Sequence, residues 1–353
     1  MSDKVLIAGF NPFYLSTDGL IKEIEITNHL SSKLVASEGT RWQLELTATH
    51  GLIAVNRTIL AISAISQQSH HLSFDHEIAQ LSASTWHCLV LLHNGDLYRY
   101  DFHQNHALKL EFLGVENLAT DDTERDRVTH VACGDRVSVA VSSSKTVFNI
   151  PNRTFRFPKH TRIAKVSVGL EHCLLLTGNG DVYSWGGGLR GQLGNGEITQ
   201  YKEEPQLIEA LAGIKIVDIA AGGWHSGAIS SFGDLYSWGW NSKGQLGLKD
   251  ECKVRGSVFP LPQLIDISVG IEEQEEISLA RVYCGKEFTL ILDSRNRIFV
   301  SGIDLSQTTI FSSVQREFKI DGFKPFEMMP TLKEQHRINC GPCSVAFERD
   351  PPK

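Results

Sequence analysis

Short apolar runs separated by turns that contain Gly-Asp recur along the chain. Two segments match almost position by position: VSVGLEHCLLLTGNGDVYSWGGGLRGQLGNG from Val166 and IAAGGWHSGAISSFGDLYSWGWNSKGQLGL from Ile219. In each, an apolar pair, a glycine and a histidine precede two β-rich runs joined by a turn, which predicts a β-hairpin with Gly180 or Gly233 at a positive φ. The copies begin at residues 166 and 219, 53 residues apart. This repeat length indicates a propeller or a solenoid of small sheets.

Weaker copies of the same unit fill much of the remaining chain. They keep the alternation of apolar and polar positions, and they lie at 46–63, 81–101, 131–150 and 282–302. A last segment, INCGPCSVAF at 338–347, is typical of the first strands of a unit without its end.

The N-terminal segment KVLIAGFNPFYLST is typical of the end of a unit. Pairing of the two chain ends would remove an open sheet edge and hold both termini in place. We therefore predict an all-β fold in which residues 1–350 form a single seven-bladed β-propeller. Its closing blade is expected to be shared by terminal strands within 4–17 and 337–348, with insertions at 102–128 and 249–279.

Histidine, tryptophan and glycine recur at fixed places in the units. A metal or catalytic centre needs side chains that converge on one point, whereas equivalent positions of different blades are spread around a ring. Recurrence therefore indicates a structural task performed once per blade. The imidazole supplies a donor and an acceptor, and the indole packs between blades. The structural repeat markers are His87, His172, His225, Trp185, Trp238, Gly169, Gly222, Gly285 and Gly341.

Residues 340–343, Cys-Gly-Pro-Cys, have the spacing of a thiol oxidoreductase motif. A reactive pair needs its first cysteine at a helix N-terminus, where the helix dipole lowers the thiol pKa. Here a run typical of a β-strand follows, and Cys340 aligns with Cys133 and Cys284, each of which precedes a glycine in another unit. We interpret Cys340 as the end of the first strand of the last unit and Gly341 as part of the turn that follows it.

No motif in the sequence indicates an enzyme. The glycine-rich stretch 186–196 lacks the Lys-Ser/Thr and the following helix of a phosphate-binding loop, which favours simple turns. Neither His-Glu-x-x-His nor Gly-x-Ser-x-Gly occurs. We expect no catalytic residue, no cofactor and no metal.

Charge and hydropathy count against DNA and membranes as binding partners. The formal net charge is −7, and no block of lysine and arginine stands out, which counts against direct DNA binding. No apolar run approaches the roughly 20 residues that span a membrane, and the apolar run near residue 5 is short for a signal peptide. We expect an intracellular chain, monomeric by itself, that binds another protein and no membrane.

The segments GLEHCLLLTGNGDVYSWGGGLRGQLGNG and GGWHSGAISSFGDLYSWGWNSKGQLG resemble repeats of the regulator-of-chromosome-condensation type of β-propeller. The arrangement of strong and degenerate copies resembles a subgroup of short single-propeller members. This resemblance implies a non-enzymatic regulatory subunit of a JmjC-domain histone demethylase or hydroxylase. It also implies contact with histones or chromatin, a location in nucleus and cytoplasm or on chromosomes and spindle, and a role in mitosis. The founding member implies an alternative, guanine-nucleotide exchange on a small GTPase, with 249–279 as the element that would displace nucleotide.

Residues that interrupt the repeat in rim loops are candidates for partner binding, because exposed tryptophan and arginine are typical interface anchors. In the two strong units these residues are Arg190, Trp224, Trp240, Asn241 and Lys243. The segment PNRTFRFPKHTR at 151–162 is expected to be an extended, exposed connection. It would offer Arg153 and Arg156 for docking or modification.

Overall fold

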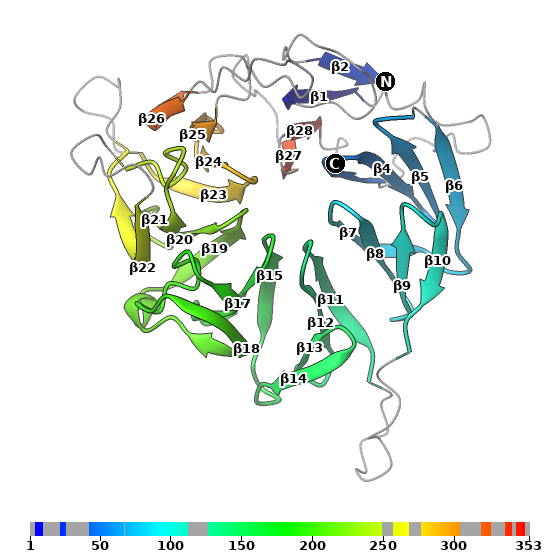
Figure 1. Cartoon of the computed structure of the whole chain (residues 1–353), viewed down its shortest axis with the longest axis horizontal. Coiled ribbons are helices and arrows are strands. Elements are labelled where there is room, and N and C mark those ends of the chain that lie inside the picture. The colour runs from blue at the N-terminus through cyan, green and yellow to red at the C-terminus, as the bar shows by residue number, and fades with distance from the viewer. Residues whose placement is uncertain are drawn as a thin grey trace.

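The computed structural model describes residues 4–9, 22–25, 42–66, 68–111, 126–248, 257–267, 277–303, 319–325, 336–340 and 344–349. These residues form an all-β fold whose single helical element is a 3-10 turn at Glu209–Leu211. Within the same ranges, no helix is long and apolar enough to cross a membrane. The strands form seven antiparallel sheets of four strands, arranged around a common axis (Figure 1).

Six of the sheets are built from strands that follow one another in sequence. They consist of β3 (Trp42–Leu46), β4 (His50–Val55), β5 (Thr58–Ser63) and β6 (Ser69–Ser73); β7 (Ile78–Ala83), β8 (His87–Leu92), β9 (Leu97–Asp101) and β10 (His106–Lys109); β11 (Val128–Cys133), β12 (Ser138–Ser142), β13 (Thr146–Asn149) and β14 (Asn152–Arg156); β15 (Ile163–Val168), β16 (His172–Thr177), β17 (Val182–Gly188) and β18 (Thr199–Leu207); β19 (Ile216–Ala221), β20 (His225–Ser230), β21 (Leu235–Trp240) and β22 (Val258–Ile265); and β23 (Leu279–Cys284), β24 (Phe288–Asp293), β25 (Ile298–Ile303) and β26 (Lys319–Pro325).

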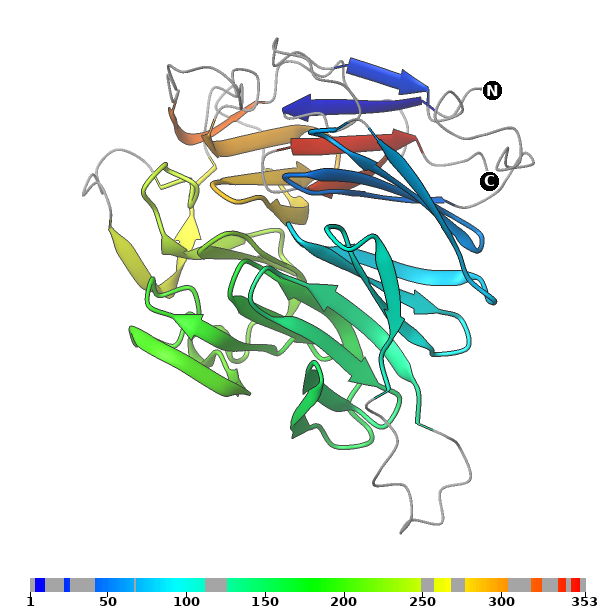
Figure 2. The ribbon, with the colours of Figure 1, turned by 45° about the vertical axis from the view of Figure 1, so that its right-hand side comes forward.

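Both ends of the chain contribute to the remaining sheet (Figure 2). Its order is β2 (Lys22–Glu25), β1 (Lys4–Gly9), β28 (Ser344–Arg349) and β27 (His336–Cys340). Leu6 of β1 lies opposite Phe347 of β28, and Phe347 lies opposite Ile338 of β27. The outer strand β2 lies beyond the segment 4–17 that the sequence indicated.

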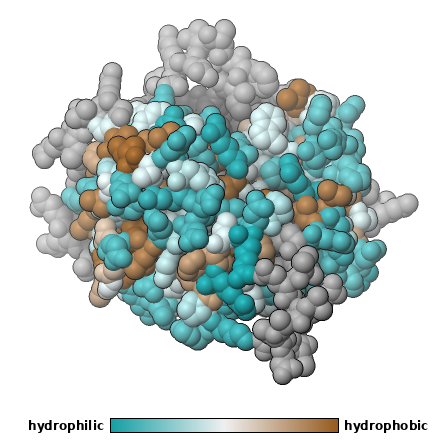
Figure 3. Space-filling view, turned by 60° about the horizontal axis from the view of Figure 1, so that its bottom comes forward, coloured by the Kyte–Doolittle hydropathy of each residue, from teal (hydrophilic) through white to brown (hydrophobic). Residues whose placement is uncertain are grey.

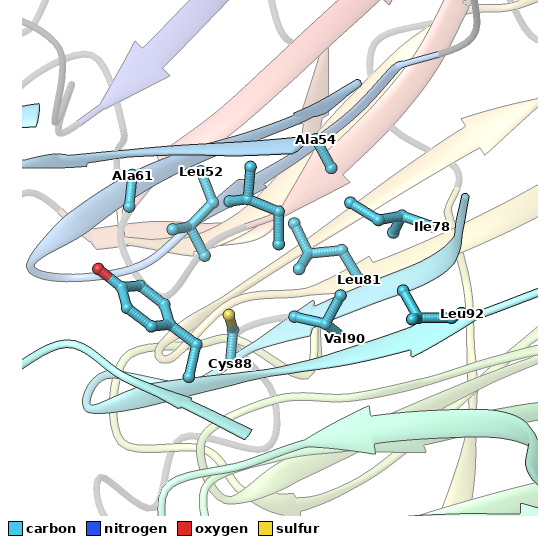
Figure 4. Close-up of a cluster of buried hydrophobic side chains, with 10 residues drawn as sticks. Leu52, Ala54, Ala61, Ile78, Leu81, Cys88, Val90 and Leu92 are labelled. Carbon is cyan, nitrogen blue, oxygen red and sulfur yellow. The ribbon is translucent and has the colours of Figure 1, made fainter. Parts of the chain in front are cut away.

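Apolar side chains of neighbouring sheets pack on each other, so the core consists of layers between sheets. All six residues of β8 are buried. Its Cys88 and Val90 pack toward sheet β3–β6, with Leu52 among their neighbours (Figure 4), whereas Leu89 and Leu91 pack toward sheet β11–β14. Successive side chains of a strand point to opposite faces, so a strand covered on both faces requires a continuous apolar run. Each fully buried leucine or valine contributes about 1.5–3 kcal/mol relative to an exposed one.

The fourth strands β6, β10, β14 and β18 are much more exposed than the inner strands of their sheets. In β10 three of four residues are exposed, and β18 is mostly exposed or half-buried. Because such a strand faces solvent, it needs no apolar pattern and can carry charges. The side of the molecule seen in Figure 3 is mainly polar among the described residues, with apolar residues in separate patches.

The outer strands β10, β14 and β22 correct three sequence-based expectations. The predicted insertion 102–128 contains β10 and the first residue of β11, and the predicted insertion 249–279 contains β22. The segment 151–162, expected to be a connection, contains β14, which pairs with β13. Residues 112–125, 249–256 and 268–276 lie outside the described part of the chain.

Candidate functional site

The turns that follow β7, β11, β15, β19 and β23, here called the inner turns, touch one another around the axis. The amide of Leu170 donates to the carbonyl of Gly222 at 3.3 Å. One sheet further, the amide of Gly223 donates to the carbonyl of Gly285 at 3.1 Å. A Cβ on Gly169 would lie 2.0 Å from the carbonyl oxygen of Gly222, and one on Gly222 would lie 2.6 Å from that of Gly285. Glycine is therefore required because the neighbouring turn approaches its backbone.

The recurring histidines are buried and reach across to the next sheet. His172 Nε2 lies 2.9 Å from Ser226 Oγ, and His225 Nε2 lies 2.9 Å from Thr289 Oγ1. His87 makes the equivalent contact with a serine hydroxyl of β12 at 3.1 Å. Each imidazole thus hydrogen-bonds a hydroxyl of the neighbouring sheet and links the two sheets.

Burial lowers the pKa of these imidazoles, because a charged ring loses its hydration. The pKa of His172 is lowered to about 3, and those of His225 and His87 to about 4. The sequence analysis missed His50, which begins β4 in the same position and whose pKa burial also lowers to about 4. His50 lies in the faint copy of the unit at 46–63, where alignment with the other histidines could have found it. Unlike them, its ring contacts a hydroxyl beside its own strand, that of Thr49.

Trp185 and Trp238 are fully buried between sheets. Trp185 Nε1 donates to Asn149 Oδ1 of the preceding sheet at 2.8 Å. Trp238 Nε1 donates to the carbonyl of Gln192, also in the preceding sheet, at 2.9 Å. Their apolar rings fill the layer while the polar nitrogen fixes the position of a loop.

Gln192, in the Gly-Gln-Leu-Gly loop, is a structural residue that the sequence analysis did not single out. Its Nε2 donates to Glu171 Oε1 at 3.1 Å, and its Oε1 accepts the amide of Arg190 at 2.8 Å. In the next sheet, Gln245 Oε1 accepts the amide of Lys243 in the same way. The buried Gln245 Nε2 has no partner among the described residues, because Trp224 stands where the preceding sheet has Glu171.

Arg190, Trp224 and Trp240 form a contact that joins two sheets at their rim, here called the rim cluster. The Arg190 guanidinium carbon lies 4.2 Å from the ring centroid of Trp224 and 4.7 Å from that of Trp240. The two indoles are 5.4 Å apart and nearly perpendicular. Arginine over a tryptophan face is attracted by the ring quadrupole, so the contact orients the guanidinium.

A pocket of about 360 Å³, here called the rim pocket, opens beside this cluster. Its walls come from the inner turns of β11 and β15, the loop after β17 and the turn after β19. They are formed by Asp135, Arg136, Leu170, Glu171, Leu189, Arg190 and Trp224.

The other candidates for partner binding lie elsewhere or have a local task. Asn241 Oδ1 accepts the amide of Leu246 at 3.0 Å, so this side chain closes its own loop. Lys243 is half-buried in that loop. Arg153 and Arg156 are exposed on β14, an outer strand of another sheet.

Two cysteines beside the inner turns, Cys133 and Cys284, are protonated thiols in the fold. A small cavity of about 100 Å³ between the inner turns is lined in part by Cys133 and Cys284. Burial raises the pKa of Cys133 to about 11 and that of Cys284 to about 12, so both are thiols at neutral pH. Cys340 ends β27, while residues 341–343, including Gly341, lie outside the described part of the chain. No group of three metal-ligating side chains occurs in the described ranges.

Comparison with known proteins identifies the repeat. Residues 179–229 and 233–292 match the model described as "Regulator of chromosome condensation (RCC1) repeat". Residues 163–192 and 216–245 match a second model with the same description.

Two curated relatives carry the name "RCC1 domain-containing protein 1". The mouse protein is 33% identical over 229 residues, which are 54% of this chain and 57% of that protein. The human protein is 52% identical over 144 residues, which are 40% of this chain and 38% of that protein. The match therefore spans less than two thirds of either relative.

Solved structures agree with this fold. Human WBSCR16 superposes with a TM-score of 0.72 at 14% identity, with 99% of this chain and 100% of that chain covered. Prp20p of Saccharomyces cerevisiae, studied for binding to Gsp1p and histones, gives 0.70 at 14% identity, covering 100% of this chain and 92% of that chain. The chain therefore carries RCC1 repeats between residues 163 and 292, is homologous to RCC1 domain-containing protein 1, and shares the fold of these solved structures.

Proposed function

We propose that this chain is a non-enzymatic platform that holds a protein partner on one rim of its propeller. The observation that carries the proposal is the rim cluster, where an arginine is oriented by two tryptophans beside a pocket of about 360 Å³. Arginine and tryptophan are the residue types that most often dominate binding energy in protein interfaces. Loops from neighbouring sheets meet there, so the surface is positioned by the sheets below it.

We also propose that the seven sheets close into one seven-bladed propeller over residues 1–350, with the closing blade shared by the chain ends. Pairing of β1 with β28 supports this, as does the position of β27 beside both β3 and β23. A closed ring would keep the rim loops in one arrangement, and a preordered surface loses less conformational entropy on binding.

For the partner we propose a JmjC-domain histone demethylase or hydroxylase, with this chain as a regulatory subunit acting in chromatin and in mitotic chromosome or spindle organisation. Homology to RCC1 domain-containing protein 1 supports this choice. The resemblance of the sequence to short single-propeller proteins of this type implied a JmjC-domain partner. The corresponding location is the nucleus and cytoplasm, including chromosomes or the spindle. Histones are the next partner to test, since the similar Prp20p was studied for histone binding.

Guanine-nucleotide exchange on a small GTPase is the second candidate, and the likeness to Prp20p, studied with Gsp1p, favours it. Exchange requires an element that displaces the nucleotide or its Mg²⁺. The segment 249–279, from which we expected such an element, contributes the outer strand β22, and its residues 249–256 and 268–276 lie outside the described ranges. A nucleotide-release assay against a panel of small GTPases tests this candidate; clear acceleration would favour it over the platform.

Affinity purification of the tagged chain from cells tests the platform. We expect one stoichiometric partner, a JmjC-domain oxygenase, that is lost with Trp240→Ala and with Arg190→Ala while the unfolding midpoint is unchanged. Arg57→Ala, at an exposed arginine of another sheet, is the matched control and should retain the partner. A double variant at Arg153 and Arg156 tests β14 as a second docking surface. Recovery of no partner above background would contradict the proposal.

A further inference from the structure

We propose that the rim pocket binds an acidic segment of a protein partner. A carboxylate of that segment would pair with Arg136 and Arg190, and a neighbouring apolar side chain would enter the pocket beside Leu189 and Trp224. This inference rests on the proposed platform function and specifies the chemistry of the partner.

The two arginines of the rim pocket are more exposed to solvent than the glutamate between them. The Arg136 side chain is 79% exposed and that of Arg190 is 37% exposed, whereas the Glu171 side chain between them is 15% exposed. Arg136 Nη1 donates to Glu171 Oε2 at 3.4 Å, and Arg190 Nη1 lies 3.9 Å from Glu171 Oε1. An approaching partner therefore meets two guanidiniums before it meets the carboxylate.

Hydrogen bonds within the fold already engage the two carboxylates of the pocket. Asp135 accepts the amide of Thr85 at 2.8 Å and its hydroxyl at 3.0 Å. Glu171 accepts Gln192 Nε2 at 3.1 Å in addition to its arginine contacts. These acceptors hold the inner turns and the Gly-Gln-Leu-Gly loop in place. A basic ligand would have to compete for them, which disfavours a basic partner at this pocket.

The guanidinium of Arg190 is positioned without being used as a hydrogen-bond donor to any described residue. Its 3.9 Å approach to Glu171 is beyond hydrogen-bond distance, and its remaining contacts are with the faces of Trp224 and Trp240. Stacking on aromatic rings fixes the guanidinium plane but leaves its N–H groups able to bind a carboxylate in the bidentate manner that arginine favours. Because the donor is preordered, little side-chain freedom is lost on binding.

Apolar surface adjoins the two guanidiniums. The Leu189 side chain is exposed, at 57%, although it is a large apolar residue, and Trp224 forms the facing wall. The combination is not repeated in the next sheet, where Trp224 and Lys243 occupy the positions of Glu171 and Arg190. The pocket is thus a local feature, and it fits a segment in which an acidic residue lies close to a leucine or an aromatic residue.

Selection from a random peptide library displayed on phage, with the full chain as bait, tests the proposal. We expect enrichment of peptides that combine aspartate or glutamate with a large apolar residue. A synthetic enriched peptide should bind the double variant Arg136→Gln and Arg190→Gln at least about tenfold more weakly by fluorescence anisotropy, equivalent to about 1.4 kcal/mol. Arg57→Gln is the control and should bind as the unchanged chain does. Binding should also weaken with added salt.

Several outcomes would overturn the inference. These are enrichment of basic peptides, no enrichment at all, or acidic peptides whose affinity is the same for the double arginine variant. Because glutamine keeps a polar side chain of similar shape, an unchanged unfolding midpoint excludes misfolding as the cause of a loss. The platform function is tested separately: a cellular partner that is lost with Trp240→Ala and with Arg190→Ala, while the peptide selection enriches no acidic sequence, would support the platform and refute the acidic segment.

Discussion

Sheets β15–β18 and β19–β22 share the inner glycine, the buried histidine and the Gly-Gln-Leu-Gly loop, and they differ in the residue before the histidine. In the first sheet this residue is Glu171, which accepts a hydrogen bond from Gln192. In the second it is Trp224, which receives Arg190 on its face and leaves the Nε2 of Gln245 without a partner among the described residues. Positions that both sheets share hold neighbouring sheets together, whereas the position that differs forms the rim surface.

In one pair of neighbouring sheets both partners of the histidine contact are replaced, the histidine in one sheet and the hydroxyl residue in the next. His172 meets the hydroxyl of Ser226, the residue that follows the next histidine. In sheet β11–β14 the histidine position is Val137, and the residue that would meet it one sheet later is Cys173 rather than serine or threonine. At this pair the hydroxyl is absent where there is no imidazole for it to contact. After His50 the corresponding residue is Cys88, and the His50 ring contacts the hydroxyl of Thr49 instead.

Acidification should produce the largest loss, because it acts on the shared histidines. The unfolded pKa of histidine is about 6.5, whereas burial holds the folded pKa of His172 near 3 and that of His225 near 4. The unfolded chain therefore takes up protons first, and the free energy of unfolding falls as the pH drops from 6.5 toward 4. At pH 5 the loss is about 2 kcal/mol for each of the two residues, and above pH 7 these groups contribute no slope.

Urea unfolding at pH 7.5, 6 and 5 measures this dependence. His225→Phe should reduce the slope, because it removes one titrating ring and Phe288 occupies the equivalent position in the next sheet. An unchanged slope in this variant would show that other groups cause the acid sensitivity.

Gly222→Ala should cost about 3 kcal/mol, because overpacking a closed contact forces the backbone to move. The added Cβ would lie 2.6 Å from the carbonyl oxygen of Gly285 and 2.4 Å from the ring of His225. Gly178→Ala is the control, since the three atoms nearest to the Cβ there lie at 3.0–3.2 Å and all belong to the side chain of the exposed Arg162. Equal losses for both variants in chemical denaturation would refute a special role of the inner turns.

Ser226→Ala should cost about 2 kcal/mol, because it leaves the buried Nε2 of His172 without its partner. The double change His172→Val with Ser226→Cys reproduces the pair that Val137 and Cys173 form naturally. Removal of both polar partners costs less than isolation of one, so the double variant should be destabilised by less than the sum of its single changes. Strict additivity in a double-mutant cycle would argue against the coupling.

Trp224→Glu should have the smallest effect on stability and should abolish partner binding. The glutamate would offer Gln245 Nε2 the acceptor that Glu171 offers Gln192, which offsets the lost contact with Arg190, so the free energy of unfolding should change by less than about 1 kcal/mol. Thermal unfolding and partner capture measured on the same preparation check both parts. A variant that still captures the partner would place the binding surface elsewhere.

The sequence was sufficient to predict residues that recur in the repeat and residues that interrupt it. The hairpins β16–β17 and β20–β21 were predicted because both faces of their strands are covered and therefore apolar. The outer strand β10 was assigned to an insertion because it faces solvent and carries little apolar signal. The outer strand β22 is rich in apolar residues, but Pro260 and Pro262 count against a strand in the sequence pattern. Arg190, Trp224 and Trp240 were selected because they break the repeat, and the structure brings these three together.

The remainder of the rim pocket could not be predicted, because it is assembled across sheets. Arg136 lies in a degenerate copy of the unit, and Glu171 is an ordinary charged residue until the neighbouring loop places Gln192 and two arginines around it. Asn241 was selected for the same reason as its neighbour Trp240, but its side chain closes its own loop. A residue that interrupts the repeat can therefore be part of a binding surface or can make a hydrogen bond within its own loop, and the sequence alone does not distinguish the two.

Hydrogen exchange of the chain, alone and saturated with its recovered partner, tests most directly whether the divergent rim forms the binding surface. The amides of residues 135–136, 170–171, 189–190 and 223–224 should gain protection in the complex, while those of the outer strands β10 and β14 should exchange at unchanged rates. Protection confined to other surfaces, with exchange at these four segments unaffected, would contradict the central claim.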